Sequence, residues 1–411
     1  MNAPPAQPLL GIEQALERVL AAIVALPHEV VALADAHGRA LAQTVQADAD
    51  VPAFDRSAMD GIALRAEDGA QGAIVSQVGE SAAGSPFLGA LLPGQCVRVM
   101  TGGVVPPGAT AVLPVERIER LDGDRYRLLE AARPEQNIAR RGSEVHQGAV
   151  VLQPGVRLHG ARVGVLATYG RDRVQVARRP VVAMLPTGNE IVPVGATPGL
   201  GQVRDANRHA LTGLLLAAGA VVQQQPVAAD ARAALTKAVT EAWRDADVLV
   251  TSGGVSAGDY DLVPPVLQSL GATLHFHKIA IKPGKPLLFA TRQHGGRTQY
   301  AFGLPGNPVS AYVCCALFVL PAIAALQGAP AGWQLLTLPS AGPLPATGPR
   351  AEILPATLLQ LAGQTHANVQ NFTSSADLTR FAQADWLAWR PAHSPQVLTG
   401  APVLLLASPR P

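Results

Sequence analysis

The stretch DVLVTSGGVSAGDYD (residues 247–261) joins a short apolar run to a loop that holds three glycines and two carboxylates. The run Val248-Leu249-Val250 is flanked by polar residues and predicts a buried β-strand. Glycines after a strand let backbone N–H groups approach a ligand closely. We therefore interpret this loop as one wall of a binding site and examine what surrounds it.

The segment 180–329 predicts a mostly parallel α/β sheet. Strands are expected at 181–185, 220–224, 247–251, 286–290 and 299–303, and helices at 206–218, 230–245 and 308–327. Strands that alternate with helices of this length are typical of a parallel sheet covered on both faces. In such sheets, ligands bind at the carboxyl ends of the strands.

The rest of the 411 residues is expected to form two further domains and an inserted lobe. Residues 11–26 have the apolar spacing of an amphipathic helix, and 150–170 are expected to pack back on it. Short apolar runs cut by glycine and proline indicate β structure elsewhere. The predicted domains are 1–48 with 143–178, an inserted β lobe at 49–142, the α/β domain at 179–329 and a C-terminal β domain at 330–411.

Composition excludes several classes of protein. Formal net charge is +2 and aromatic residues are 4%, so neither a nucleic-acid protein nor a membrane-surface protein is expected. Three cysteines without C-x-x-C spacing fit a reducing cytoplasm, and the N-terminus does not resemble a signal peptide. Residues 308–326 are uncharged over nearly a membrane span, but Pro321 interrupts them, which favours a buried helix.

Four loops in the α/β segment carry unusual residues: PTGNE (186–190), TSGGVSAGDYD (251–261), KIAIKPGKP (278–286) and GLPGNPVSAY (303–312). Glycine backbone and a helix N-terminus capped by Asn307 suit a phosphate. Lysines neutralise phosphate oxygens, and hard carboxylates hold Mg²⁺. Each loop alone is as well explained by an ordinary turn, and it is their combination that favours a ligand site.

Together with DRSAMDGIALR (55–65) and VMTGGVVPPGATAVLPVE (99–116), these loops stand in the order found in molybdopterin molybdotransferases. The chain resembles that family from about residue 10 to its end, and it is also similar to the C-terminal part of gephyrin. The resemblance implies a homodimer of multi-domain subunits, with a split N-terminal domain, an α/β molybdopterin-binding domain and a C-terminal β-barrel-like domain.

The implied reaction inserts molybdenum from molybdate into adenylylated molybdopterin, with Mg²⁺-assisted release of AMP. The product is molybdenum cofactor. The resemblance further implies small-molecule substrates, handover between an adenylyltransferase and molybdoenzyme partners, and no nucleic acid or membrane partner.

The resemblance also implies site residues. Asp60 and Thr101 would complete the cleft of the partner subunit, and the other residues implied to be catalytic are Glu190, Asp230, Asp261, Lys278 and Lys282. The implied metal ligands are Glu190, Asp259 and Asp261. The molybdate pocket would be lined by Lys282, Lys285, Pro286, Arg350 and Ser375. The remaining implied cofactor-binding residues are Gly188, Ser252, Gly253, Gly254, Ser256, Gly258, Pro305, Gly306, Asn307 and Pro308.

The chain departs from the family pattern near its C-terminus, where Trp386 replaces a usual glycine and NFTSS replaces a Gly-Ser signature before Ser375. Asp230 matches a family aspartate when the alignment at this point is allowed a shift of one residue. His275 and His277 alternate on an expected strand, where a metal pair is the less favoured interpretation. Cys314 and Cys315 are interpreted as buried thiols in a helix rather than as nucleophiles.

Two alternatives to molybdenum insertion stay open at this stage. One is adenylylation of molybdopterin by ATP, and the lobe around DRSAMDG and the C-terminal domain argue against it. The other is a scaffold that binds cofactor without turnover, and the intact acidic and lysine loops argue against that.

Overall fold

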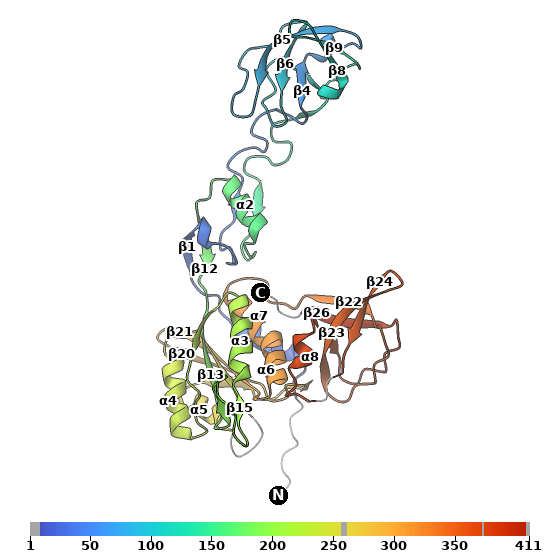
Figure 1. The fold of residues 1–411 in the computed structure, drawn as a ribbon. Helices are drawn as coiled ribbons and strands as arrows, with labels where there is room; N and C mark the ends of the chain where they lie inside the picture. The colour runs from blue at the N-terminus through green and yellow to red at the C-terminus, as the bar shows by residue number, and fades with distance from the viewer. Residues whose placement is uncertain (1–8, 256–260, 372–373, 408–411) are drawn as a thin grey trace. The chain divides into compact units, whose positions relative to one another are not determined.

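A computed structural model describes residues 9–255, 261–371 and 374–407. The chain divides into two compact units (Figure 1). One comprises Thr44–Gln153 with Gly160–Asp172, and the other comprises Met1–Gln43, Pro154–His159 and Arg173–Pro411. The finer division into four domains stays a prediction.

The smaller unit is built on a six-stranded sheet, in agreement with the predicted β lobe. Its order is β7 (Ala111–Pro114), β4 (Gly61–Leu64), β6 (Gln95–Val99), β5 (Ile74–Ser81), β9 (Arg125–Leu128) and β8 (Ile118–Leu121). Alternating residues of β4 enter two cores, with Ile62 and Leu64 in one and Ala63 in the other. Smaller elements are β2 (Val45–Gln46) with β11 (Val150–Leu152), β3 (Arg56–Ser57) with β10 (Ile138–Ala139), and helix α2 (Gly160–Thr168).

The larger unit contains the predicted α/β sheet. Its order is β16 (Val221–Gln224), β13 (Val181–Pro186), β17 (Val248–Ser252), β21 (Arg297–Leu304), β20 (Leu288–His294) and β18 (Thr273–Phe276). The first four strands are mutually parallel, whereas β20 and β18 are each antiparallel to their neighbour. Strands β13, β17 and β21 are mostly buried, whereas the edge strand β16 is largely exposed.

Alternate residues of these strands supply the two cores. Val182 and Met184 face helix α3 (Ala206–Ala217), and Ala183 and Leu185 face α4 (Arg232–Ala242) and α5 (Val263–Ser269) (Figure 1). Helix α5 was not predicted from the sequence. Its prolines lie in the first turn, where a missing N–H costs no helical hydrogen bond.

The apolar stretch at 308–326 is a core helix in three parts: α6 (Pro308–Cys314), a π-helical turn (Cys315–Val319) and α7 (Leu320–Leu326). By length and composition it could cross a membrane, but 72% of an 18-residue stretch of it is buried inside the protein. Pro321 cannot donate to the Leu317 carbonyl four residues earlier, and the Trp333 indole donates to that oxygen at 3.0 Å. The expected buried helix is thus observed.

A second sheet follows and includes one strand from the α/β segment. Its order is β19 (Ile281–Lys282), β23 (Ala351–Leu361), β25 (Trp386–Arg390), β26 (Pro402–Ala407) and β22 (Leu335–Pro339), with β24 (Gln364–Val369) paired to β23. A bridge between Ser340 and Ala367 connects the β22 end to β24, which gives the barrel-like curvature. Other elements of this unit are α1 (Ile12–Ala22), α8 (Thr379–Ala382), β1 (His28–Ala32) with β12 (Arg173–Ala177), and β14 (Ile191–Val192) with β15 (Val203–Arg204).

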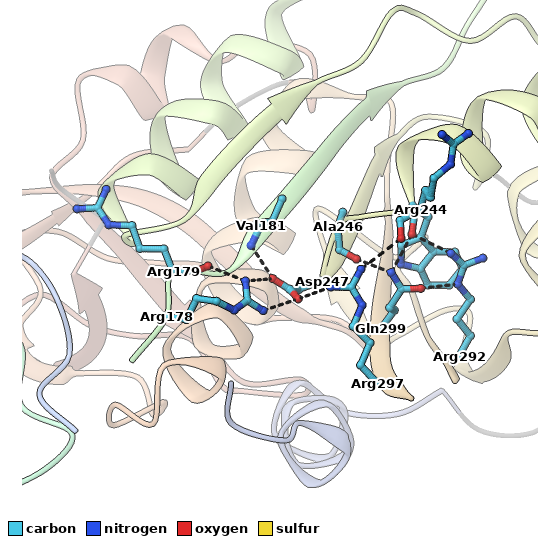
Figure 2. Close-up of polar contacts among 10 residues, drawn as sticks. Arg178, Arg179, Val181, Arg244, Ala246, Asp247, Arg292, Arg297 and Gln299 are labelled. Carbon is cyan, nitrogen blue, oxygen red and sulfur yellow. Dashed lines mark hydrogen bonds and ion pairs between the residues drawn. The ribbon is translucent and has the colours of Figure 1, made fainter. Parts of the chain in front are cut away.

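Asp247 fixes the register of the α/β sheet at the amino ends of its strands (Figure 2). This buried carboxylate accepts from the Val181 backbone N–H at 2.8 Å and from both guanidinium ends of Arg178, at 2.8 and 3.0 Å. The Arg297 guanidinium lies 3.4 Å from the Asp247 carboxylate. The Asp247 backbone carbonyl accepts from the Tyr300 N–H. One residue therefore ties β13, β17 and β21 together.

We expect Asp247→Asn to lower the free energy of unfolding by about 2 kcal/mol, since hydrogen bonds to charged partners contribute about 1.5–3 kcal/mol. The measurement is the thermal unfolding midpoint of the intact chain by calorimetry. Asp245→Asn, at an exposed position two residues away, is the matched control. Equal midpoints for the two variants would contradict the assignment.

Candidate functional site

Three site loops begin side by side because the strands before them end in register. Pro186 of β13 lies opposite Ser252 of β17, which lies opposite Leu304 of β21. The loops continue this pairing: the Thr187 N–H donates to the Ser252 carbonyl and the Gly253 N–H to the Leu304 carbonyl, both at 3.0 Å. The fourth loop, 278–286, follows β18 and precedes β20, and Leu288 pairs with Gly303 at the same edge.

A cavity of about 680 Å³ opens at this edge of the sheet. The predicted residues among those that line it are Gly188, Glu190, Asp230, Ser252, Gly253, Gly254, Pro286, Pro305, Gly306, Asn307 and Pro308. Gly253 has φ +98°, and a Cβ there would lie 2.5 Å from the Thr187 carbonyl oxygen. Only glycine lets these two loops approach so closely.

Asp230 and Glu190 bring carboxylates to this first cavity. The Asn189 backbone N–H donates to Asp230 Oδ2 at 3.2 Å, and the Asp230 N–H donates to Asn189 Oδ1 at 3.1 Å. This reciprocal pair joins the loop after β13 to the segment after β16. The Glu190 residue is exposed, which leaves its carboxylate accessible from the cavity.

Two lining residues, Asp205 and Asn207, were missed from the sequence. Asp205 caps α3 by accepting from the Arg208 N–H at 3.0 Å. Asn207 donates to the Gly306 carbonyl at 2.7 Å and so holds the loop after β21. The signal available was the capping pattern of VRDANRH after a short strand.

Asn307 occupies the N-cap position of α6 as predicted, but its side chain makes no capping bond. The Val309 N–H, which such a cap could satisfy, instead donates to the Ser375 carbonyl at 3.0 Å. The start of the long helix is therefore attached to the C-terminal segment.

A second cavity, of about 660 Å³, adjoins the first and shares Pro286 and Ser310 with it. Its walls include the predicted Lys282, Lys285, Arg350 and Ser375, and also Glu352. Three cations against one carboxylate make this cavity suitable for an anion. Ser375 therefore lines this cavity with the other predicted residues, although the sequence around it departs from the family pattern.

The KPGK loop rests on a buried thiol. Gly284 has φ +109°, and a Cβ there would lie 2.6 Å from Cys314 Sγ. Cys314 Sγ lies 3.5 Å from the Gly284 carbonyl oxygen. Burial raises the pKa of Cys314 and Cys315, in keeping with inert thiols.

Asp261 and Lys278 line neither cavity and belong to a separate cluster. Asp261 Oδ2 lies 3.2 Å from His277 Nε2. Burial raises the pKa of Asp261, and the charges of His277 and Lys278 partly offset this. His275 bonds Thr291 and stacks on Phe289, so the two histidines do not share a ligand. Within the described ranges no group of three His, Cys, Asp or Glu side chains is placed to hold a metal.

Asp60 and Thr101 contact each other in the smaller unit. The Thr101 backbone N–H and hydroxyl both donate to Asp60 Oδ1, at 2.6 and 2.7 Å. The backbone N–H of Thr101, and then its hydroxyl, lowers the pKa of Asp60. Ser256, Gly258 and Asp259 lie outside the described residues.

Comparison with known proteins agrees with this arrangement. Residues 10–170 match the model of the MoeA N-terminal region (domain I and II), and residues 183–325 match a probable molybdopterin binding domain. The chain is 34% identical to a molybdopterin molybdenumtransferase of Nostoc over 93% of its own length and 89% of the relative. The chain belongs to the molybdopterin molybdenumtransferase family.

Other members support the same assignment. A molybdopterin molybdenumtransferase of Haemophilus influenzae is 37% identical over 78% of each chain. The crystal structure of a molybdopterin biosynthesis MoeA protein from Pyrococcus horikoshii superposes with a TM-score of 0.83 at 27% identity, covering 97% of this chain and all of that one. The multi-domain α/β and β fold expected from the sequence is confirmed.

We expect Gly284→Ala to destabilise the protein by about 2 kcal/mol, because alanine would clash with Cys314 and strain the backbone. Adding Cys314→Ala should recover part of this loss, since the clash disappears while the strain at φ stays. The measurement is a double-mutant cycle of unfolding midpoints. Cys315→Ala is the control that should recover nothing, and strictly additive effects of the first pair would contradict the contact.

We expect Asp261→Asn to stabilise the protein increasingly as pH rises. A raised pKa means that the folded state favours the protonated carboxyl, so stability from this group is complete at low pH and lost as pH rises through the folded-state pKa. Unfolding midpoints of wild type and variant, compared from about pH 4 to about pH 8, test this. A midpoint difference that is constant over this range would contradict it.

Proposed function

We propose that this protein inserts molybdenum from molybdate into adenylylated molybdopterin and releases AMP, giving molybdenum cofactor. The supporting observation is the pair of adjoining cavities, one walled by glycine loops and carboxylates and the other by cations. The relatives named molybdopterin molybdenumtransferase cover most of the chain and support the same activity.

The first cavity suits the phosphate-bearing substrate. The Gly254 backbone N–H offers a donor at one edge of the sheet, and the start of α6 adds a favourable helix dipole. Glu190 and Asp230 lie on the opposite loops and would orient the ligand by accepting its hydroxyl or amine donors.

The second cavity suits molybdate. Lys282, Lys285 and Arg350 give fixed positive donors to a dianion, and Ser375 adds a hydroxyl. The shared residues Pro286 and Ser310 leave the oxyanion next to the organic substrate. Holding the two reactants side by side makes the transfer effectively intramolecular.

The transfer balances as follows. Two sulfur–molybdenum bonds form, and one molybdate oxygen leaves as water with the two thiol protons. A second water molecule cleaves the phosphoanhydride and gives AMP and the molybdopterin phosphate. The lysine ammonium groups neutralise the charge that collects on the oxyanion and phosphate oxygens.

Mg²⁺ suits the donors present. It binds through one or two carboxylates together with phosphate oxygens and retained waters, so a cage of three protein ligands is not required. Of the predicted set, Glu190 would hold it from the first cavity. Asp261 lines neither cavity and Asp259 lies outside the described residues, so their part in holding the ion stays a prediction from the sequence. The ion would neutralise phosphate charge when bound.

We further propose that the protein acts as a homodimer. A cytoplasmic location is also proposed, and its three free cysteines are consistent with that location. Asp60 and Thr101 of each subunit would then complete the cleft of the partner. Substrate would arrive from an adenylyltransferase, and product would pass to molybdoenzymes.

We expect purified protein to release AMP from adenylylated molybdopterin when molybdate and Mg²⁺ are present. Lys282→Met, Asp261→Asn and Asp60→Asn should each lower that rate at least tenfold, because each removes a charge proposed to contact substrate or metal. Glu119→Gln, which removes a surface partner of Arg127, should match wild type.

Three results would contradict this proposal. Formation of adenylylated molybdopterin from ATP, without AMP release from it, would favour an adenylyltransferase. Stoichiometric binding without turnover would favour a scaffold. Full activity in all three variants would remove the assigned roles.

A further inference from the structure

Lys282 is part of both a loop and a β-sheet. It begins the KPGK loop of the α/β segment, and as part of β19 it is also an edge residue of the C-terminal sheet. In the parallel pairing of β19 with β23, Ile281 lies opposite Ala351 and Lys282 lies opposite Glu352. The Ala351 N–H donates to the Ala280 carbonyl at 3.0 Å, which fixes this register.

The register places two opposite charges together. Lys282 Nζ lies 3.0 Å from Glu352 Oε1. The lysine side chain is 57% exposed, whereas the glutamate side chain is only 17% exposed. The lysine is thus the more exposed partner, and the largely buried carboxylate is the one that restrains it. On its other side, Glu352 lies opposite the buried Arg390 of β25.

A carboxylate is an unexpected neighbour in this cavity. Lys282, Lys285 and Arg350 carry positive charge toward the enclosed volume, and Glu352 opposes them. Its own charge repels an oxyanion, so it weakens the binding of molybdate. In return it restricts an exposed lysine that would otherwise sample many rotamers. Because an ammonium has three donors, Lys282 can keep this bond and still donate to an anion.

We propose that Glu352 is the positioning residue of the anion cavity: it aims Lys282 at the oxyanion and limits how tightly the cavity holds that anion. This inference rests on the proposed function of the site. It means that the Glu352 side chain lowers the affinity for molybdate and raises the rate of AMP release. A purely structural contact between β19 and β23 would do neither.

The test separates binding from turnover with Glu352→Gln, which keeps the shape of the side chain and removes its charge. Binding of sodium molybdate to the intact protein is measured by calorimetry, and AMP release is measured at saturating molybdate. Removing one negative charge at roughly 8 Å from a dianion, in a water-like dielectric, should tighten binding about fivefold. AMP release should fall about tenfold, because a neutral amide holds the Lys282 ammonium less firmly than the carboxylate does.

A second variant keeps the inference testable if the first folds poorly. Glu352→Asp retains the charge but draws the carboxylate back by one methylene. Molybdate affinity should stay within about twofold of wild type while AMP release still falls. Glu119→Gln again serves as the control, with unfolding midpoints recorded for every variant.

The outcomes distinguish the two hypotheses. Weaker molybdate binding in Glu352→Gln, or unchanged AMP release in both Glu352 variants, overturns the role of Glu352. If wild type releases no AMP, the proposed function fails, and the calorimetric comparison still decides whether Glu352 limits anion binding.

Discussion

Asp247 and the parallel pairing of β13, β17 and β21 are the constraint on which the site depends. The carboxylate joins the amino ends of these strands, and the backbone ladder then carries the register to Pro186, Ser252 and Leu304. A shift of one residue would turn every strand side chain to the opposite core. It would also separate the loops, which approach one another only because their strands end at the same level.

The second constraint is the strand β19, which belongs by sequence to the α/β segment and by pairing to the C-terminal sheet. Because of this pairing, the cationic cavity is lined by residues of the α/β segment and of the C-terminal sheet. Helix α6 reinforces this connection through the bond from Val309 to Ser375. Residues close together in the chain, such as Gly188 and Glu190, therefore serve one cavity, whereas Lys282 and Arg350 meet only after the two parts pack.

Sequence reasoning succeeded where a local signal was strong. The apolar runs at 181–185 and 247–251 predicted buried strands, and the glycine-rich loops predicted a cavity at their carboxyl ends. It missed α5, whose prolines lie in a first turn, and it assigned a capping bond to Asn307 that Ser375 makes unnecessary. It also overlooked Asn207, whose contact with Gly306 joins positions far apart in sequence.

The sequence by itself determined the alternation of strands and helices, the loops that carry charge and the family to which the chain belongs. These follow from periodicity and short motifs, which act over a few residues. Only the tertiary structure decided that Glu352 meets Lys282, that Cys314 supports Gly284 and that Asp261 lies beside His277. Such contacts depend on strand register and on packing between distant segments, and no local pattern encodes either.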